Sequence, residues 1–427
     1  MEFNKICVLG LGYIGLPTAS TFAAQGLRVI GVDVNPQVVA TLQNGDVHIQ
    51  EPGLRTLVQA ALKSGNLMIR TQPEEADAFI IAVPTPFYDD KRADMRAVTA
   101  ATEAIVQHLR KGNLVMLEST SPPRTTVDLV APILERSGLH AGTDFYLAYT
   151  PERVAPGKIL RELTENDRVI GGIDRHSAEA GRDLYALFVR GDIVLTDATT
   201  AEMVKLMENT YRDINIAIAN EFSRLADRLG INVWEAISIA NRHPRVRILN
   251  PGPGVGGHCI GVVPWFLVKA APDLTPLIVS ARQVNDGQPC FVIDLFRRAL
   301  GDLSGKRIAI LGLSFKEDVD DLRESPGIEV ARLLDKAGVK VKAFEPYKLD
   351  AQIPGITTVP TLELALADVD AFALLVLHRS FRELDPQKVA NLTSARIAID
   401  TVNGWPSEAW KSTGFRIYKL GDGRDAI

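Results

Sequence analysis

The amino-acid sequence predicts an α/β protein with two doubly wound domains joined by a long central helix. Three observations support this fold class. Short apolar strands alternate with helical segments in the first third of the chain, and the same alternation returns in the last third. A glycine-containing turn follows the first strand of each of these parts. Between them, one long segment repeats its apolar residues at helical spacing.

Length and composition set the expected domain organisation. At 427 residues the chain has room for two or three domains. We expect an α/β domain over residues 1–195, a central helical and dimerisation region with a glycine-rich loop over 196–300, and a second α/β domain over 301–427. With 46% hydrophobic and 23% charged residues, the composition is that of an ordinary soluble protein.

Charge and cysteine content argue against several classes of function. A formal net charge of −5, without a long run of Lys or Arg, argues against a nucleic-acid partner. The longest apolar runs are too short to cross a membrane. The chain has three cysteines, no secretory signal pattern and no histidine spacing typical of a metal site. We therefore expect a cytoplasmic protein that needs no metal.

The N-terminal segment predicts a Rossmann-like dinucleotide-binding domain. A strand, Lys5–Leu9, is followed by a Gly-x-Gly-x-x-Gly turn that opens a helix, so that a pyrophosphate can approach the helix N-terminus. Asp33 ends the next strand and is expected to bind the adenosine ribose hydroxyls. A carboxylate there would repel a 2′-phosphate, which favours NAD over NADP. The expected cofactor-binding residues of the turn are Gly10, Gly12, Tyr13, Ile14 and Gly15.

Two further strands of this domain end in loops rich in proline and hydroxyl groups. The strands 78–83 and 114–118 lead into loops that contain Thr85 and Thr120. Open α/β sheets bind ligands at the carboxyl ends of their strands, so both threonines are candidate cofactor-binding residues. A simple role in a turn remains the alternative for each.

The long helix is predicted from Thr200, as its cap, to Leu229, with Gly230 after it. At a rise of 1.5 Å per residue it would be roughly 45 Å long, enough to connect two domains and support a dimer interface. Lys205 and Asn209 stand four residues apart and project from one face. A solvated charged face is the alternative explanation for this pair.

The C-terminal third predicts a second Rossmann-like domain. Its first strand, 306–311, leads into Gly312, but the second and third glycines of the fingerprint are missing. We therefore expect a nucleotide-binding domain of a different kind, without a second full dinucleotide site. Lys316 and Arg323 are its candidate anion or hydrogen-bond donors.

A glycine-rich loop, Pro251–Cys259, ends in a cysteine. Four glycines in this loop allow positive φ angles and the close approach of a ligand. A thiol carried on such a loop suits covalent catalysis. An incidental buried cysteine in a turn is the alternative.

These segments resemble the nucleotide-sugar 6-dehydrogenases of the UDP-glucose/GDP-mannose dehydrogenase family from Lys5 to about Trp405. The resemblance implies NAD-dependent, four-electron oxidation of the C6 hydroxyl of UDP-N-acetyl-D-mannosamine to the uronate, through a thiohemiacetal and a thioester on Cys259. It also implies a homodimer or higher homo-oligomer that supplies polysaccharide synthesis. The segments that carry the resemblance are Pro151–Val154, Glu165–Gly172, Thr200–Met203, Asn241–Val246, Gly256–Ile260 and Pro264–Phe266.

The same resemblance implies roles for individual residues. Cys259 is the expected nucleophile, Lys205 the proton donor or oxyanion stabiliser with Asn209 beside it, and Glu152 acts in acid–base steps through water. Arg323 is expected to reach NAD. The expected substrate-binding residues are Arg153, Val154, Lys205, Asn209, Arg212, His243, Arg245, Gly256, Phe315 and Lys316.

Two positions depart from the family pattern and keep alternatives open. Val263 stands where the family commonly has an aspartate four residues after the cysteine, and Val402 lies where a basic residue is common. A UDP-N-acetylglucosamine 6-dehydrogenase is one alternative, and a slow or inactive nucleotide-sugar-binding homologue is another. A two-electron dehydrogenase of the β-hydroxyacid type would share the fingerprint and a Lys-x-x-x-Asn helix, but would need neither Cys259 nor the C-terminal domain.

Overall fold

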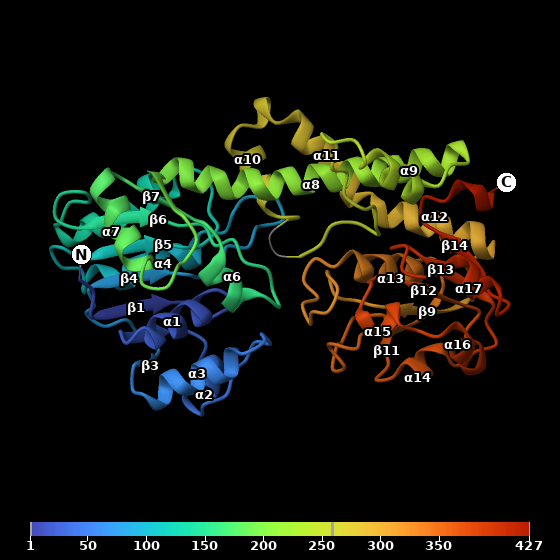
Figure 1. Ribbon diagram of the computed structural model, residues 1–427, viewed down its shortest axis with the longest axis horizontal. Coiled ribbons are helices and arrows are strands. Elements are labelled where there is room, and N and C mark those ends of the chain that lie inside the picture. Colours follow the sequence, from blue (N-terminus) through green and yellow to red (C-terminus); the bar gives the residue numbers. More distant parts are fainter. Residues whose placement is uncertain (1, 258–259, 427) are drawn as a thin grey trace. The chain divides into compact units, whose positions relative to one another are not determined.

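The computed structural model describes residues 2–257 and 260–426. The chain forms two compact units. Unit 1 runs to Glu208 and includes Trp265–Pro272, and unit 2 contains Asn209–Pro264 and Asp273 onward. Each unit is built around one sheet flanked by helices, which confirms the predicted fold class (Figure 1). The domain boundaries at 195 and 300 stay a prediction.

The sheet of unit 1 has the strand order β3-β2-β1-β4-β5-β6-β7-β8. The pairs are parallel except that β7 runs antiparallel to β6. Its strands are β1 (Lys5–Leu9), β2 (Arg28–Val32), β3 (Leu67–Arg70), β4 (Ala78–Ile81), β5 (Leu114–Leu117), β6 (Tyr146–Tyr149), β7 (Arg168–Gly172) and β8 (Ile193–Asp197).

The helices of unit 1 begin where short polar side chains can accept backbone N–H groups. Asn35 caps α2, with Pro36 as its first residue, and Asp174 caps α7. The α-helices are α1 (Gly15–Ala24), α2 (Pro36–Gln43), α3 (Leu54–Lys63), α4 (Arg96–Val106), α5 (Ala131–Leu134), α6 (Ile159–Glu165) and α7 (Arg175–Tyr185). A π-helical turn, η1 (Thr126–Val130), precedes α5, and a 3₁₀ turn, η2 (Glu135–Ser137), follows it.

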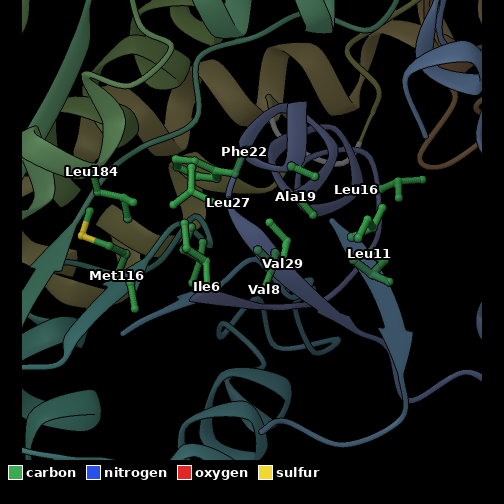
Figure 2. Close-up of a cluster of buried hydrophobic side chains, with 14 of the residues drawn as sticks. Ile6, Val8, Leu11, Leu16, Ala19, Phe22, Leu27, Val29, Met116 and Leu184 are labelled. Atoms are coloured by element: carbon green, nitrogen blue, oxygen red, sulfur yellow. The ribbon is translucent and has the colours of Figure 1, made fainter. Parts of the chain in front are cut away.

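The core of unit 1 lies on both faces of its sheet. Along β1, Ile6 and Val8 belong to one apolar cluster, and Cys7 and Leu9 belong to another. Strands buried on both faces are apolar at successive positions, as β1 and β4 are here. Figure 2 shows part of the first cluster, in which side chains of α1 such as Phe22 face those of the sheet. Burying each such side chain contributes about 1.5–3 kcal/mol.

The long helix α8 (Ala198–Leu229) has 32 residues. The prediction of a threonine cap is wrong, because the helix begins two residues before Thr200. The carboxylate of Asp197 accepts the Thr200 N–H at 2.9 Å and its hydroxyl at 2.5 Å, so Asp197 is the capping residue. The C-terminal end is as predicted, with Gly230 at φ +69° directly after the helix.

The apolar residues of α8 that recur at helical spacing are largely exposed. Burial against the rest of the chain does not explain them, because the exposed fraction reaches 56% for Met207 and 67% for Tyr211. Their spacing places them along one face of α8, and we call this set the apolar stripe. The exposed members are Met203, Met207, Tyr211, Ile218, Phe222, Leu225 and Leu229.

The sheet of unit 2 is parallel throughout and has the order β11-β10-β9-β12-β13-β14. This order, in which the first strand lies between the second and the fourth, is that of a doubly wound nucleotide-binding sheet. Its strands are β9 (Arg307–Leu311), β10 (Lys340–Phe344), β11 (Thr357–Thr358), β12 (Ala371–Leu374), β13 (Ile397–Asp400) and β14 (Arg416–Lys419).

The second sheet is also covered on both faces. Alternate residues of β9 enter two separate apolar clusters, Ile308 and Ile310 on one side and Ala309 and Leu311 on the other. The remaining helices are α9 (Val233–Ala240), α10 (Val263–Ala270), η3 (Pro272–Leu274), α11 (Pro276–Asp286), α12 (Gln288–Leu300), α13 (Pro326–Lys336), α14 (Leu362–Leu366), α15 (Arg379–Arg382), α16 (Pro386–Leu392), α17 (Ser407–Lys411) and η4 (Gly423–Ala426). Within the described ranges, the search for a helix able to cross a membrane finds none.

Candidate functional site

The carboxyl ends of five strands meet at one edge of the first sheet. In the register of the parallel pairs, Leu9 lies beside Val32 and Ile81, Ile81 beside Leu117, and Leu117 beside Tyr149. The residues that follow these strands therefore share one edge. They include Gly10, Asp33, Thr85, Glu118, Thr120 and Glu152.

The glycine turn after β1 has the geometry that a dinucleotide requires. Gly10 has φ +92°, and a Cβ there would lie 2.6 Å from the carbonyl oxygen of Ala82. A Cβ on Gly15 would collide with the carbonyl oxygen of Gly10. At Gly12 no atom lies within 4 Å of a built Cβ, so the side of the turn that a pyrophosphate would approach is open. Tyr13 and Ile14 complete the turn before α1.

Asp33 follows β2 and organises this turn. Its Oδ2 accepts the Leu11 N–H at 3.0 Å, and its Oδ1 accepts the Asn35 N–H at 2.9 Å. The carboxylate is partly exposed and has further acceptor positions available to a ribose diol. The structure therefore places the predicted ribose-binding acid beside the phosphate-binding turn.

Thr85 and Thr120 are brought together at the same edge. The hydroxyl of Thr85 donates to the carbonyl oxygen of Thr120 at 2.6 Å, and Thr85 is buried. This bond fixes the loops after β4 and β5 relative to each other. A direct contact of either threonine with the cofactor stays a prediction.

Asp33→Ala is expected to raise KM for NAD about 10- to 100-fold. A hydrogen bond to a charged group contributes about 1.5–3 kcal/mol, and the variant would lose the ribose contact together with the bond to Leu11. Steady-state kinetics with NAD and NADP would measure this. Asp46→Ala removes an exposed aspartate paired with Arg55 and is the control, expected to leave KM unchanged. A preference of the wild type for NADP would contradict the assignment.

Lys205 and Glu152 are in direct contact. The Lys205 ammonium donates to the backbone carbonyl of Glu152 at 2.6 Å. The Glu152 side chain is buried, and its Oε1 accepts the Arg153 N–H at 2.7 Å. The Lys205 ammonium is therefore fixed to the backbone of Glu152, just beyond the carboxyl end of β6, while the Glu152 carboxylate is held by Arg153 and Arg168.

The neighbouring candidate substrate-binding residues, Arg153 and Val154, are also held in place by contacts within unit 1. The Arg153 guanidinium donates to the carbonyl of Asp167 at 3.1 Å and pairs with Glu208 of α8 at 2.7 Å. Val154 is partly buried and packs against the first core cluster. A second carboxylate, Glu51, accepts the N–H groups of Gly157 and Ile159 and so holds the end of this loop.

Glu152 belongs to a buried polar cluster with Arg168, Glu118 and Tyr185, which was not identified from the sequence. Arg168 of β7 bonds both Glu118 and Glu152, and Tyr185 of α7 donates to Glu118 at 2.9 Å. The signal in the sequence is a charged residue at the end of each of two otherwise apolar strands, β5 and β7. Burial raises the pKa of Glu118 to about 7, while the charge of Arg168 lowers it.

In unit 2, the glycine-rich loop packs against the segment after β9. The Gly257 N–H donates to the carbonyl oxygen of Arg323 at 3.1 Å. Gly257 has φ +85°, and a Cβ there would lie 2.6 Å from the ring of Phe315. A Cβ on Gly256 would lie 3.0 Å from Phe315 Cβ. The structure thus brings together Gly256, Phe315 and Arg323. The Arg323 guanidinium forms an ion pair with Asp321 at 2.7 Å.

The other unit 2 candidates are more dispersed. Asn209 is buried and its Nδ2 has no hydrogen-bond partner among the described residues, as expected of a ligand-binding amide. Arg212 stands three residues further along α8 and is exposed. His243 and Arg245 are exposed in the loop after α9, and Lys316 is exposed in the loop after β9.

Glu345, which follows the second strand of unit 2, forms hydrogen bonds to other groups of the protein. Glu345 Oε2 accepts the N–H groups of Leu313 and Ser314 at 2.7 and 2.9 Å. It also lies 3.1 Å from Nε2 of the buried His378, whose Nδ1 accepts the Asp318 N–H. Glu345 stands where Asp33 stands in unit 1, but it is buried and fully engaged.

Cys259 lies outside the described residues, so its predicted role is not tested by the geometry. Val263, the first residue of α10, is buried, with 2% of its surface exposed. Of the two cysteines in the described ranges, Cys7 is buried in β1 and Cys290 is exposed on α12. Burial raises the pKa of the Cys7 thiol to about 12.

Comparison with known proteins identifies similar chains over the whole length. The UDP-glucose/GDP-mannose dehydrogenase family matches in three parts. Its NAD binding domain matches residues 4–189, its central domain residues 199–287 and its UDP binding domain residues 309–406.

Individual relatives are similar at high coverage. UDP-N-acetyl-D-mannosamine dehydrogenase of Methanocaldococcus jannaschii is 47% identical, over 99% of this chain and 98% of the relative. NDP-N-acetyl-D-galactosaminuronic acid dehydrogenase of Ralstonia solanacearum is 48% identical, over 96% and 98%. The solved UDP-D-ManNAc dehydrogenase of Pyrococcus horikoshii has a TM-score of 0.92 at 39% identity and covers 98% of this chain and 100% of its own.

Proposed function

Because the chain belongs to the UDP-glucose/GDP-mannose dehydrogenase family, we propose that it oxidises the C6 hydroxyl of UDP-N-acetyl-D-mannosamine to the carboxylate. The protein is an NAD-dependent nucleotide-sugar dehydrogenase. The observation that carries the proposal is the contact of Lys205 with Glu152 at the edge where the NAD turn also lies. This contact fixes a cation, Lys205, to the residue that carries the second proposed acid–base group.

The proposed reaction removes four electrons from one carbon. A primary alcohol, two NAD and water give a carboxylate, two NADH and three protons. Bound NAD supplies the hydride acceptor for both oxidations. In the first, the C6 hydroxyl loses its proton and C6 loses a hydride, which leaves an aldehyde. Lys205 is proposed to stabilise the negative charge on the C6 oxygen or to return a proton to it.

The second oxidation is proposed to occur on the protein. The thiolate of Cys259 adds to the aldehyde carbon, and the carbonyl oxygen takes up a proton, which gives a thiohemiacetal. Loss of that hydroxyl proton to water and of a second hydride from C6 to the hydride acceptor gives a thioester. Water then adds to the thioester carbon, and the carbon–sulfur bond breaks to release the carboxylate and the thiol. Glu152 is proposed to accept the proton of this water. Asn209, with its unpartnered Nδ2, is proposed to bind the sugar.

Cations and backbone groups are proposed to hold the rest of the substrate. Arg323 is proposed to bind NAD. The UDP-sugar is proposed to contact Arg153, Val154, Lys205, Asn209, Arg212, His243, Arg245, Gly256, Phe315 and Lys316.

A UDP-N-acetylhexosamine of another configuration is the alternative substrate. A relative at 48% identity is an NDP-N-acetyl-D-galactosaminuronic acid dehydrogenase. Oxidation of UDP-N-acetylglucosamine at C6 by the same chemistry is the other alternative. A slow enzyme is favoured by one observation. The buried Val263 supplies no carboxylate for thioester hydrolysis, so deacylation becomes the slow step.

We also infer a cytoplasmic homodimer whose product supplies polysaccharide synthesis. The apolar stripe of α8 is the proposed dimer surface, because a stripe of seven exposed apolar side chains is costly to leave in water. Sedimentation at several concentrations tests the oligomeric state. A monomer at all of them would overturn this inference.

Counting NADH against a panel of UDP-sugars tests the function. We expect two NADH for each UDP-N-acetyl-D-mannosamine, with slower oxidation of its glucosamine and galactosamine isomers. Rapid mixing should show a burst approaching two NADH per active site before slow turnover, as expected when an acyl-enzyme accumulates. One NADH per sugar would support a two-electron enzyme, and binding without NADH would support an inactive homologue.

A further inference from the structure

Arg168 holds two buried carboxylates at once. Its Nη1 lies 3.2 Å from Glu118 Oε1, and its Nη2 lies 2.7 Å from Glu152 Oε2. The exposed fractions of Arg168, Glu118 and Glu152 are 4%, 3% and 8%. One guanidinium neutralises only one carboxylate, and a second buried negative charge would be costly. The group therefore favours a state with one extra proton.

Glu118 is the member that holds this proton. Its distance to Arg168 is the longer of the two, and its Oε2 is buried without a hydrogen-bond partner among the described residues. Both oxygens of Glu152, by contrast, accept hydrogen bonds, from Arg153 and Arg168. The pKa of Glu118 is raised to about 7, chiefly by burial; the charge of Arg168 lowers it and the charge of Glu152 raises it within that balance.

The other groups that face Glu118 do not compete for this proton near neutral pH. Tyr185 donates to Glu118 Oε1, and its ring lies 4.4 Å from the Arg168 guanidinium. Tyr149 of β6 faces Glu118 from the neighbouring strand and also faces Glu202 and Glu208 of α8. Burial raises the pKa of both tyrosines well above the usual value, so both stay neutral.

We propose that Glu118, Arg168 and Glu152 form one proton-sharing unit in which Glu118 is a positioning residue that sets how strongly Arg168 pairs with Glu152. This inference rests on the proposed role of Glu152 as the base for water. While Glu118 is protonated, the guanidinium of Arg168 pairs with the carboxylate of Glu152 alone. When Glu118 loses its proton, the guanidinium is shared between two carboxylates, and its pairing with Glu152 weakens, which frees that carboxylate to act on water.

The pH dependence of kcat for Glu118→Gln tests the proposal. The amide keeps the shape of the protonated acid and cannot ionise. From about pH 5 to about pH 9, wild-type kcat should rise through an inflection near pH 7, and the variant should lack it. The kcat of the variant should match that of the wild type on the acid side of the inflection and fall below it on the alkaline side, because the amide cannot draw the Arg168 guanidinium away from Glu152.

A second variant, Tyr185→Phe, is expected to shift the inflection in the pH profile of kcat and not to remove it. Tyr185→Phe removes the hydrogen bond that stabilises ionised Glu118, so the inflection should move to higher pH. Glu202→Gln is the matched control, because Glu202 is also buried and its pKa is also raised by burial, but its carboxylate bonds Thr126 and the Arg124 N–H. That variant should keep the inflection near pH 7.

Thermal stability gives a readout independent of turnover. A glutamate whose pKa is about 7 when folded and 4.5 otherwise contributes stability that is fully present below pH 4.5 and lost as pH rises to 7. The fall in Tm over this window should be smaller in Glu118→Gln than in the wild type.

The outcomes separate this inference from the proposed function. Superimposable wild-type and Glu118→Gln profiles, in rate and in Tm, would overturn the proton-sharing unit while leaving the function intact. If the wild type oxidised no UDP-sugar, the function would fail, and the Tm comparison would still decide where the proton lies. If Glu118→Gln did not fold, an unshifted inflection in Tyr185→Phe would overturn the inference.

Discussion

Replacing Cys259 with alanine should abolish uronate formation while NAD and UDP-sugar still bind within a few-fold of the wild type. Without the thiol, no covalent bond holds the aldehyde for its second oxidation. Removal of a covalent nucleophile costs as much as about 10⁶ in kcat in a well-studied hydrolase, so a loss of at least about 10³-fold is expected here. Intact-mass analysis of the wild type with NAD and substrate should find the acyl group on Cys259.

The chain offers a matched control for this variant. Cys290→Ala removes the exposed thiol on α12 and should leave turnover unchanged. Cys7 is not a competing nucleophile, because burial in β1 raises the pKa of its thiol to about 12 and keeps it protonated. Uronate production by Cys259→Ala at a rate near that of the wild type would end the covalent mechanism.

Lys205→Ala should lower kcat by about 10²–10⁴-fold with a small change in KM. This is the usual contribution of a positioned acid–base group. The Lys205 ammonium lies 2.6 Å from the backbone carbonyl of Glu152, so the variant removes a charge from the edge of the sheet where the reaction is proposed to occur. Steady-state kinetics separates the two constants. Lys63→Ala, on the exposed end of α3, is the control. A rise in KM alone would make Lys205 a binding residue and not an acid–base group.

The sequence predicts the architecture well because each element carries a strong local signal. The strand and glycine turn at Lys5–Gly15 lie where they were expected, and β9 starts one residue later than predicted. The helix α8 ends before Gly230 as the periodicity indicates. Its beginning was missed, because the preceding Asp197 belongs to β8 and reads as part of a strand.

Pairings distant in the sequence could not be predicted. The antiparallel placement of β7 beside β6 has no local signature, and it is this placement that brings Arg168 next to Glu118, 50 residues earlier. Likewise, nothing in the sequence indicates that Glu345 bonds Leu313 and His378. Local motifs predict which residues contact ligands, whereas the groups that support those residues depend on tertiary contacts.

The burial of Glu345 bears on the order in which two NAD molecules bind during the proposed reaction. The carboxylate that could meet a ribose in unit 2 is already committed to Leu313 and Ser314, so the glycine turn after β1 is the dinucleotide cradle that the described chain provides. Under the proposed four-electron reaction, two NAD must then occupy this one cradle in succession. The half-oxidised sugar has to outlast the departure of the first NADH and the arrival of the next NAD. The lifetime of this half-oxidised sugar therefore depends on how fast NADH dissociates from the turn and NAD binds in its place. A longer lifetime gives the sugar more time to leave as free aldehyde.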